Sequence, residues 1–435
     1  DDRGEVGEAG AALERQMVET AAHYGLRVMG PNGIGIIDST TPLNTTFVRG
    51  VPPRGEIAFL SQSGALCGGI IDWTIGEGIG FSRFLSVGNE ADVKETDILP
   101  FLACDDASKV IALYLEDIKG GPRFVEALRG AAAQKPVLAL KTGRTTSGQA
   151  ATASHTGALA SPYAAFRAAC RQAGVVEAET VKGLFDGALA LAHQPLPAGN
   201  RIAVVTNAGG PAAVAADCFE RAGLVLADIS DDSRTELRQH LHPDAQVGGL
   251  TDMLGGADEN QYRHSMEVVL RDANVDGVLV IVIPHALVNP VAIVKAIGEA
   301  TVAIQRSKPV VACMLGKASL EAAFATAHDL RIPAYTFPED AVVAYSALYQ
   351  RTRLSAKIAS RQAPPTVDRS AVTAVREAIE RAKATGNKGL DAAASRSLLT
   401  AYGIAAPVDF LATTPDEAAE HARRAGFPGA LKLAS

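Results

Sequence analysis

The chain has 435 residues, of which 47% are hydrophobic and 20% charged, and its net charge is −7. This length exceeds that of an ordinary domain, and the composition is that of a globular protein with several buried cores. The acidic balance and the lack of a basic stripe with interleaved aromatic residues argue against binding to nucleic acids or anionic membranes.

Short apolar runs alternate with alanine-rich helical stretches, a pattern typical of parallel α/β layers. The chain opens with an amphipathic run, Ala11–Tyr24, of the kind that normally connects strands. The predicted strands are, in order, Arg27–Met29, Ile57–Leu60, Val110–Tyr114, Val137–Lys141, Arg201–Thr206, Gly277–Ile283 and Val310–Met314. The predicted helices between them include Ala65–Glu77, Phe124–Ala133 and Pro211–Ala222.

The two halves of the chain repeat one another. The sequence GEIAFLSQSGALCG at 55–68 resembles NRIAVVTNAGGPAA at 200–213, and KPVLALKTG at 135–143 resembles KPVVACMLG at 308–316. We interpret these as two doubly wound domains of similar plan. Any α/β protein can produce some such echoes, so common ancestry and chance similarity both remain open.

Proline-rich joints divide the chain at Gln194–Asn200 and Arg361–Asp368. After the second joint the pattern predicts a helix, a short strand, a second helix and a terminal strand. Because the chain starts at Asp1 and ends within that last predicted strand, we expect missing segments at both ends.

Two turns between strand and helix are candidate phosphate sites. SQSGAL follows Leu60 and TNAGGP follows Val205. A helix start presents unpaired N–H groups and a partial positive charge, so it binds phosphate. For each turn alone, ordinary helix capping is the better explanation. Two similar turns favour a shared phosphate site.

The segment 142–161 consists mainly of Gly, Ser, Thr and Ala, and is expected to form a mobile loop. It contains His155, whose neutral ring nitrogen can act as a nucleophile; a plain exposed loop histidine is the alternative. Glu116 and Asp117 end a predicted strand, where α/β sites assemble, and either orient an imidazole or cap a helix. No cluster of His, Asp and Glu indicates a protein-bound metal.

The five cysteines are scattered without metal or redox spacing, which indicates reduced thiols: Cys67, Cys104, Cys170, Cys218 and Cys313. No secretory segment opens the chain, and its most apolar stretch, 275–294, is interrupted by prolines. We therefore expect a cytoplasmic protein.

Several motifs together resemble the NDP-forming acyl-CoA synthetases, which include the ADP-forming acetyl-CoA synthetases and relatives of succinyl-CoA synthetase. They are GPNGIGIID (30–38), SQSGAL (61–66), IGFSRFLSVGNEADV (79–93), VIALYLEDI (110–118), KPVLALKTGRTTSGQAATASHTGAL (135–159) and VTNAGGP (205–211). Their order and spacing agree over roughly the whole chain, and the SHTGAL block is highly specific.

The resemblance implies an α/β fold in four parts. Residues 1–50 would end a Rossmann-like CoA-binding domain, 51–197 would form a ligase domain with a phosphohistidine loop, 198–364 a second flavodoxin-like ligase domain, and 365–435 the start of an ATP-grasp domain. His155 resembles the phosphorylated histidine and Glu116 the carboxylate that steadies it. Ser61, Gln62, Ser63, Gly64, Ala65, Asn207, Ala208, Gly209 and Gly210 resemble paired phosphate-binding helix starts. Pro31 and Asn32 would border the CoA site, and Lys432 is similar to a nucleotide-binding lysine.

The chain departs from the family pattern in two motifs. Gly33 follows GPN where the family usually has Cys, and GGLTDMLGG (248–256) stands where NPVD is common. With most of the CoA-binding domain and part of the ATP-grasp domain absent, this fragment alone is not expected to turn over.

The implied function is an acid–CoA ligase that interconverts acyl-CoA, ADP and phosphate with a carboxylic acid, ATP and CoA through phospho-His155. Mg²⁺ is expected with the nucleotide, and a homo-oligomer is expected. The alternative is a non-ligating, acyl-CoA-binding regulatory paralogue. A nicotinamide-dependent enzyme is disfavoured because no G-x-G-x-x-G follows a strand.

Overall fold

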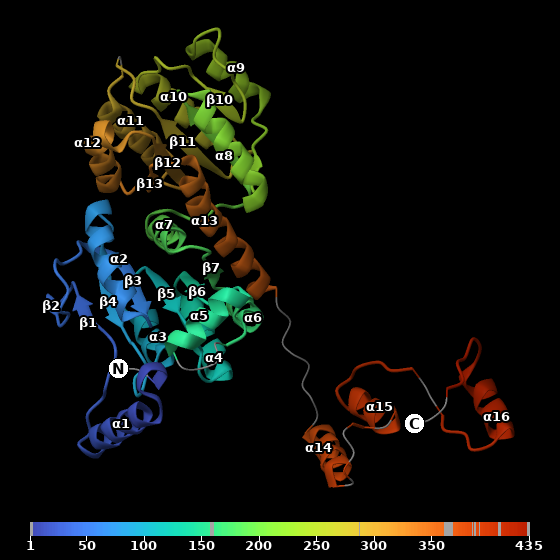
Figure 1. The fold of residues 1–435 in the computed structure, drawn as a ribbon. Coiled ribbons are helices and arrows are strands. Elements are labelled where there is room, and N and C mark those ends of the chain that lie inside the picture. Colours follow the sequence, from blue (N-terminus) through green and yellow to red (C-terminus); the bar gives the residue numbers. More distant parts are fainter. Residues whose placement is uncertain are drawn as a thin grey trace. The chain divides into compact units, whose positions relative to one another are not determined.

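The computed structural model describes residues 3–156, 161–286, 288–360, 369–384, 386, 389–390, 392–407 and 410–432. The chain divides into two compact units, Asp1–Ser360 and Arg361–Ser435. Unit 1 contains two sheets covered by helices (Figure 1). No described helix is long and apolar enough to span a bilayer.

The first sheet of unit 1 has the strand order β2-β1-β4-β3-β5-β6-β7. Strands β3 to β7 run parallel, whereas β1 pairs antiparallel with both β4 and β2. The strands are β1 (Gly35–Asp38), β2 (Leu43–Asn44), β3 (Arg54–Ser61), β4 (Phe81–Ser86), β5 (Val110–Leu115), β6 (Val137–Lys141) and β7 (Val176–Glu177). The helices are α1 (Arg3–His23), α2 (Gly64–Glu77), α3 (Glu95–Cys104), α4 (Gly121–Gln134), α5 (Thr146–Thr156), α6 (Tyr163–Ala173) and α7 (Val181–His193).

The second sheet is parallel and has the order β10-β8-β11-β12-β13, with β9 paired to the start of β8. Its strands are β8 (Arg201–Thr206), β9 (Val225–Leu226), β10 (Leu250–Asp252), β11 (Gly277–Val282), β12 (Val310–Met314) and β13 (Ala334–Tyr335). Its helices are α8 (Gly209–Ala222), α9 (Asp231–His240), α10 (Glu259–Arg271), α11 (Pro290–Ala303), α12 (Lys317–Asp329) and α13 (Pro338–Ala359).

The strand order β4-β3-β5-β6-β7 in the first sheet corresponds to β10-β8-β11-β12-β13 in the second. In both orders the strand that starts the repeat, β3 or β8, lies in second place. The strand in first place follows one helix later in the first sheet (β4), and follows α8, β9 and α9 in the second (β10). The repeated plan predicted from the sequence is therefore confirmed at the level of topology.

Six of the seven predicted strands are present within one or a few residues of their expected bounds. The predicted strand Arg27–Met29 is wrong. The N–H of Val28 donates to the carboxylate of Asp92 instead of to a neighbouring strand. Pro31 follows closely, and proline lacks the N–H that would continue a ladder.

β1 belongs to the first sheet, since Gly35–Asp38 pairs with residues 83–86 of β4. The strand part of the segment predicted to end a CoA-binding domain thus lies in the same sheet as β3. The domain boundaries expected at residues 50, 197 and 364 remain predictions.

Unit 2 contains α14 (Arg369–Ala384), α15 (Ala392–Ala401) and α16 (Pro415–Ala425). The described residues of this unit include no strand. The strand predicted after Gly426 is therefore wrong for residues 426–432.

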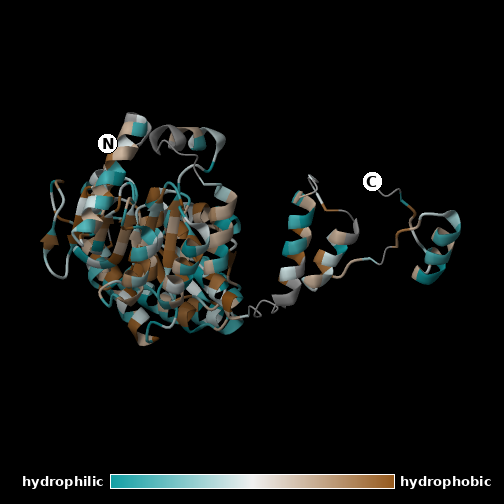
Figure 2. Ribbon diagram, turned by 90° about the horizontal axis from the view of Figure 1, so that it is seen from below, coloured by the Kyte–Doolittle hydropathy of each residue, from teal (hydrophilic) through white to brown (hydrophobic). Residues whose placement is uncertain are grey.

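The core follows from the composition of the central strands. Every residue of β6, β11 and β12 is buried, as expected for parallel strands covered on both faces. Figure 2 shows hydrophobic residues concentrated in the sheets and hydrophilic residues on the outer helix surfaces.

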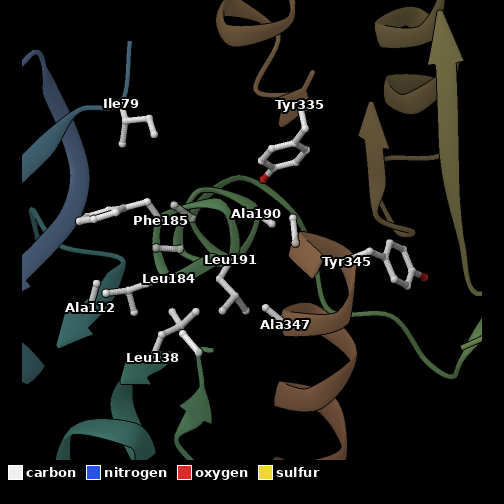
Figure 3. Close-up of a cluster of buried hydrophobic side chains, with 14 of the residues drawn as sticks. Ile79, Ala112, Leu138, Leu184, Phe185, Ala190, Leu191, Tyr335, Tyr345 and Ala347 are labelled. Atoms are coloured by element: carbon white, nitrogen blue, oxygen red, sulfur yellow. The ribbon is translucent and has the colours of Figure 1, made fainter. Parts of the chain in front are cut away.

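Helix α7 joins the two sheets. Leu184 and Phe185 point to the first sheet, and Leu191 lies between that sheet and α13 (Figure 3). Phe185 packs against Phe59 of β3 with ring centroids 5.1 Å apart. Because α7 is buried nearly all round, it acts as a shared core element rather than a surface helix.

Candidate functional site

The turn between β3 and α2 presents unpaired N–H groups. The Ser61 hydroxyl donates to the Ser63 carbonyl at 3.0 Å, and the Ser63 side chain caps the N–H of Leu66 at 3.4 Å. Among the described residues, neither Gly64 nor Ala65 donates its N–H to a partner. These two groups point out of the helix start, where the helix dipole favours an anion.

Pro31 and Asn32 lie beside this helix start. A Cβ on Gly64 would come within 2.8 Å of the Asn32 carbonyl oxygen. The N–H of Asn89 donates to the Pro31 carbonyl at 2.8 Å, which fixes the segment in place. The structure therefore brings the predicted CoA-border residues to the start of α2.

Gln62 has a different role from the one predicted. Its side-chain oxygen accepts the N–H groups of Glu116 and Asp117, at 2.6 and 3.0 Å. Its side-chain nitrogen donates to Glu90 and to the Asp117 carbonyl, and its backbone N–H donates to Tyr114. With these groups all used, Gln62 ties the ends of β3 and β5 together and has no donor left for phosphate.

Glu116 lies directly after β5, half-buried, at the same carboxyl edge as the α2 start. Lys141, the last residue of β6, donates its ammonium to the carbonyls of Glu116 and Thr142 at 3.0 and 3.1 Å. Burial lowers the pKa of Lys141, although the carboxylates of Asp117 and Glu116 oppose that shift. A buried cation therefore lies beneath the segment that carries Glu116.

The His155 segment is helical where a mobile loop was expected. Residues Thr146–Thr156 form α5, and the Thr145 hydroxyl caps it by accepting the N–H of Gly148 at 3.1 Å. The run QAATASH is rich in alanine, the best helix former, which explains the difference. The side chain of His155 lies outside the described residues, so its predicted role remains a prediction.

The second turn repeats the first. Asn207 donates to the Ile283 carbonyl at 3.0 Å and accepts the Ile283 N–H at 2.9 Å, so it joins β8 to the end of β11. Like Gln62, its side chain serves the scaffold rather than an anion. Gly209 and Gly210 carry the unpaired N–H groups that follow Ala208, the N-cap residue. A Cβ on Gly209 would lie 2.9 Å from the Asp252 carboxylate, which makes this helix start less favourable for an anion.

The two helix starts do not share one pocket within unit 1. The far end of α2, at Glu77, forms an ion pair with Lys317 at 2.7 Å. Lys317 begins α12 at the carboxyl edge of the second sheet, the edge where α8 also begins. The start of α2 is therefore separated from this contact by the length of the helix, about 20 Å. Figure 1 shows α2 and α8 on opposite flanks of unit 1. The shared phosphate site expected from the two turns is therefore not formed within unit 1, and it remains a prediction.

Three predicted features remain: Lys432, the glycine at position 33 and the lack of a metal cluster. Lys432 is exposed in unit 2. A Cβ on Gly33 would come within 2.5 Å of the Ser86 carbonyl oxygen, which explains why cysteine is absent there. In the described part of the chain, no group of three or more His, Cys, Asp or Glu side chains is placed to hold a metal.

Three residues at the site were missed by sequence reasoning: Glu90, Glu95 and Lys141. Glu90 accepts the Gln62 amide at 2.8 Å and the Glu95 N–H at 3.1 Å. All three are at least 97% buried. For Lys141 the available signal was a charged residue at the end of an apolar strand; Glu90, in a turn, and Glu95, at a helix start, had no such signal.

Family models match most of the chain. Residues 54–191 match a succinyl-CoA ligase like flavodoxin domain, 202–359 a ligase-CoA domain, and 381–435 an ATP-grasp domain.

Curated relatives agree with these matches. The chain is 42% identical to the alpha subunit of an ADP-forming acetate–CoA ligase II of Pyrococcus furiosus, over 80% of this chain and 77% of that subunit. It is 37% identical to an ADP-forming acetate–CoA ligase I of Archaeoglobus fulgidus, over 99% of this chain but 61% of that protein. A 4-hydroxybutyrate–CoA ligase of Nitrosopumilus maritimus is 32% identical, and 62% of it is covered.

A solved structure also resembles the chain. The dinucleotide-forming acetyl-coenzyme A synthetase 1 of Ca. Korarchaeum cryptofilum, in complex with phosphate and ADP, has a TM-score of 0.77 and 34% identity over 83% of this chain and 78% of that one. The relatives are named as ligases, which does not favour a regulatory paralogue. On the fold, the matched domains and these identities, the chain belongs to the ADP-forming acyl-CoA ligases, a family of acid–thiol ligases.

Proposed function

We propose that this protein interconverts acyl-CoA, ADP and phosphate with a carboxylic acid, ATP and CoA, and that His155 carries the phosphoryl group. The observation that supports this most is the Gln62 bridge, which places the start of α2 and Glu116 at one edge of the first sheet. The unpaired N–H groups of Gly64 and Ala65 suit a phosphate there, and Pro31–Asn32 lies alongside for CoA.

The proposed chemistry has three transfers. A phosphate oxygen attacks the thioester carbonyl, the C–S bond breaks, and CoA leaves as the thiol. An imidazole nitrogen of His155 then attacks phosphorus, and the bond to the acyl oxygen breaks to release the carboxylate. Finally a terminal oxygen of ADP attacks the phosphohistidine, which yields ATP and free imidazole.

The protein groups have distinct parts in this scheme. The α2 start would stabilise the negative charge on phosphate during the first two transfers. Glu116 would hold one imidazole nitrogen protonated, so that the other attacks. Mg²⁺ and the nucleotide would bind with the ATP-grasp part, to which Lys432 belongs.

The start of α8 lies on the other flank of unit 1. In this proposal, one copy of the chain would supply the α2 start and a second copy the α8 start of a phosphate site that uses both. This agrees with the expectation of a homo-oligomer, and we include a symmetric dimer in the proposal.

Labelling of the full-length protein with ATP carrying a labelled γ-phosphate tests the carrier role. His155→Ala should abolish the acid-labile phosphoenzyme, while His242→Ala, a change at an exposed histidine after α9, should retain it. Undiminished label on the His155 variant would refute the proposal. Formation of ATP from acyl-CoA, ADP and phosphate by the unaltered protein tests the overall reaction.

A further inference from the structure

Glu90 and Glu95 form a buried acidic pair next to the candidate site. Glu90 follows β4 in a turn with a positive φ of 53°, and Glu95 is the first residue of α3. Their exposed fractions are 3% and 0%. Two ionised carboxylates cannot share such a site without a large electrostatic cost.

The hydrogen bonds of the pair are unequal. Both Glu90 oxygens accept N–H groups, one from Gln62 and one from the Glu95 backbone. Neither Glu95 side-chain oxygen has a partner among the described residues. A proton on one carboxyl would supply the missing donor, since a protonated carboxyl donates one hydrogen bond to its neighbour.

We propose that Glu90 and Glu95 share a proton and that this pair, with a single negative charge, holds Gln62 in position. Gln62 in turn fixes the backbone of Glu116 and Asp117. Glu90 is thus a positioning residue that acts on Glu116 through Gln62. The expected effect on phosphoenzyme formation rests on the proposed function, whereas the shared proton itself does not.

The surroundings fit a pair with a single negative charge. Burial, and then the Glu95 carboxyl, raise the pKa of Glu90 to about 9. Burial also raises the pKa of Glu95, although Lys119 and Lys94 oppose that shift. Lys94 directly precedes α3, and Lys119 lies in the loop before α4; among the described residues these are the cations that act on Glu95. Gln62, which follows β3, is neutral.

The start of α8 differs from the start of α2 in the partners of the residue that joins strand and helix. In the part of the chain that the structure describes, the side-chain hydrogen bonds of the equivalent residue, Asn207, go to the backbone of Ile283, and none goes to a carboxyl. We therefore expect a change of pH to affect the start of α2, through Gln62. We expect no such effect at the start of α8, where Asn207 stands.

The sign of the pH dependence follows from the raised pKa of Glu90. The ordinary pKa of a glutamate is about 4.5, and below that pH the contribution of Glu90 to folding stability is fully present. This contribution is lost as the pH rises through about 9, the pKa of Glu90 in the folded protein. The thermal midpoint of the wild-type chain should therefore fall between pH 8 and pH 10. In Glu90→Gln this fall should be less than half as large, because an amide cannot ionise.

The catalytic readout is phosphoenzyme formation by the full-length protein, expressed as the ratio of rates at pH 9 and pH 7. Glu90→Gln should raise this ratio at least about threefold over wild type. Glu90→Ala, which removes one of the two acceptors of the Gln62 amide, should slow the reaction at both pH values. Glu116→Gln serves as the control, because it should depress labelling yet keep the wild-type pH dependence of unfolding.

The outcomes separate the two proposals. A Glu90→Gln protein with the wild-type alkaline fall in thermal midpoint would overturn the shared proton. A full-length protein that forms no phosphoenzyme at any pH would refute the proposed function, while the unfolding curves would still decide on the pair.

Discussion

Arg331, which precedes β13 of the second sheet, forms an ion pair with Glu56 of β3 in the first sheet at 2.5 Å. Its guanidinium also donates to the carbonyl of Ala192, near the end of α7, at 2.9 Å. One side chain thus joins both sheets and the helix between them. Glu56 is held by Lys109 as well, and these cations lower its pKa against the effect of burial.

Arg331→Ala should lower the free energy of unfolding by about 1 to 2 kcal/mol, since it removes a partly buried ion pair and a backbone contact. Urea unfolding at pH 7 measures this loss. Arg123→Ala removes the more exposed pair with Asp97 and should cost less than about 1 kcal/mol. Equal losses in the two variants would show that Arg331 adds nothing as a link between the sheets.

His193, the last residue of α7, should make the folded protein less stable in acid. It lies where α7 meets Arg331. Burial, and then the nearby Arg331, lower its pKa to about 4. The unfolded chain takes up this proton more readily, so stability is present above pH 6.5 and is lost as the pH falls towards 4. We expect this group to cost about 3 kcal/mol between pH 7 and pH 4.

His193→Gln should therefore flatten the unfolding free energy over that range. Denaturant curves at pH 7, 5.5 and 4 measure it. The unaltered protein, measured alongside, gives the reference slope. A His193 variant with that same slope would contradict the assignment of acid sensitivity to this residue.

Gly33 tests whether this chain can accept the cysteine that is common in the family. A Cβ at this position would lie 2.5 Å from the Ser86 carbonyl, a backbone atom that moves only with β4. Gly33→Ala and Gly33→Cys should each cost about 1 to 3 kcal/mol.

The matched control is Gly130→Ala within α4, where a Cβ meets no atom within 4 Å. That change should be neutral or stabilise by up to about 1 kcal/mol, because alanine is the better helix former. Thermal unfolding compares the three variants. A Gly33→Cys protein as stable as wild type would show that the β4 backbone yields easily.

The sequence predicted the framework well because the central strands are continuous apolar runs. Val137–Lys141 and Val310–Met314 match β6 and β12 at both ends. Short segments at the edges of the sheets were harder to predict from the sequence. Arg27–Met29 has the residue types of a strand, but its backbone bonds to a side chain from a distant turn. Alanine-rich α5 was misjudged because glycine, serine and threonine around it suggested a loop.

The candidate site was predicted in location but not in roles. The turn residues and Glu116 do lie at one edge, as the ends of parallel strands must. The use of Gln62 could not be read from the sequence, because its partners Glu90 and Glu116 are 28 and 54 positions away. The opposite placement of α2 and α8 depends on how the two sheets pack through α7, which local patterns do not encode.

Lys141 tests whether a buried cation positions the candidate site. It was not among the site residues predicted from the sequence, but it contacts the backbone that carries Glu116. It is 1% exposed and donates to the carbonyls of Glu116 and Thr142. Lys141→Met should cost about 1 to 3 kcal/mol by leaving these carbonyls unpaired. It should also slow phosphoenzyme formation, because the Glu116 carbonyl loses the hydrogen bond from the ammonium.

Lys135 offers a matched control at the opposite end of β6. Its ammonium likewise donates to backbone carbonyls, those of Leu102 and Asp105, and burial likewise lowers its pKa. Lys135→Met should therefore lose comparable stability, yet keep wild-type labelling per folded molecule at a temperature where both variants are folded. If the two variants label equally, Lys141 contributes only to folding. If only the Lys141 variant loses label, the buried ammonium positions the segment that carries Glu116.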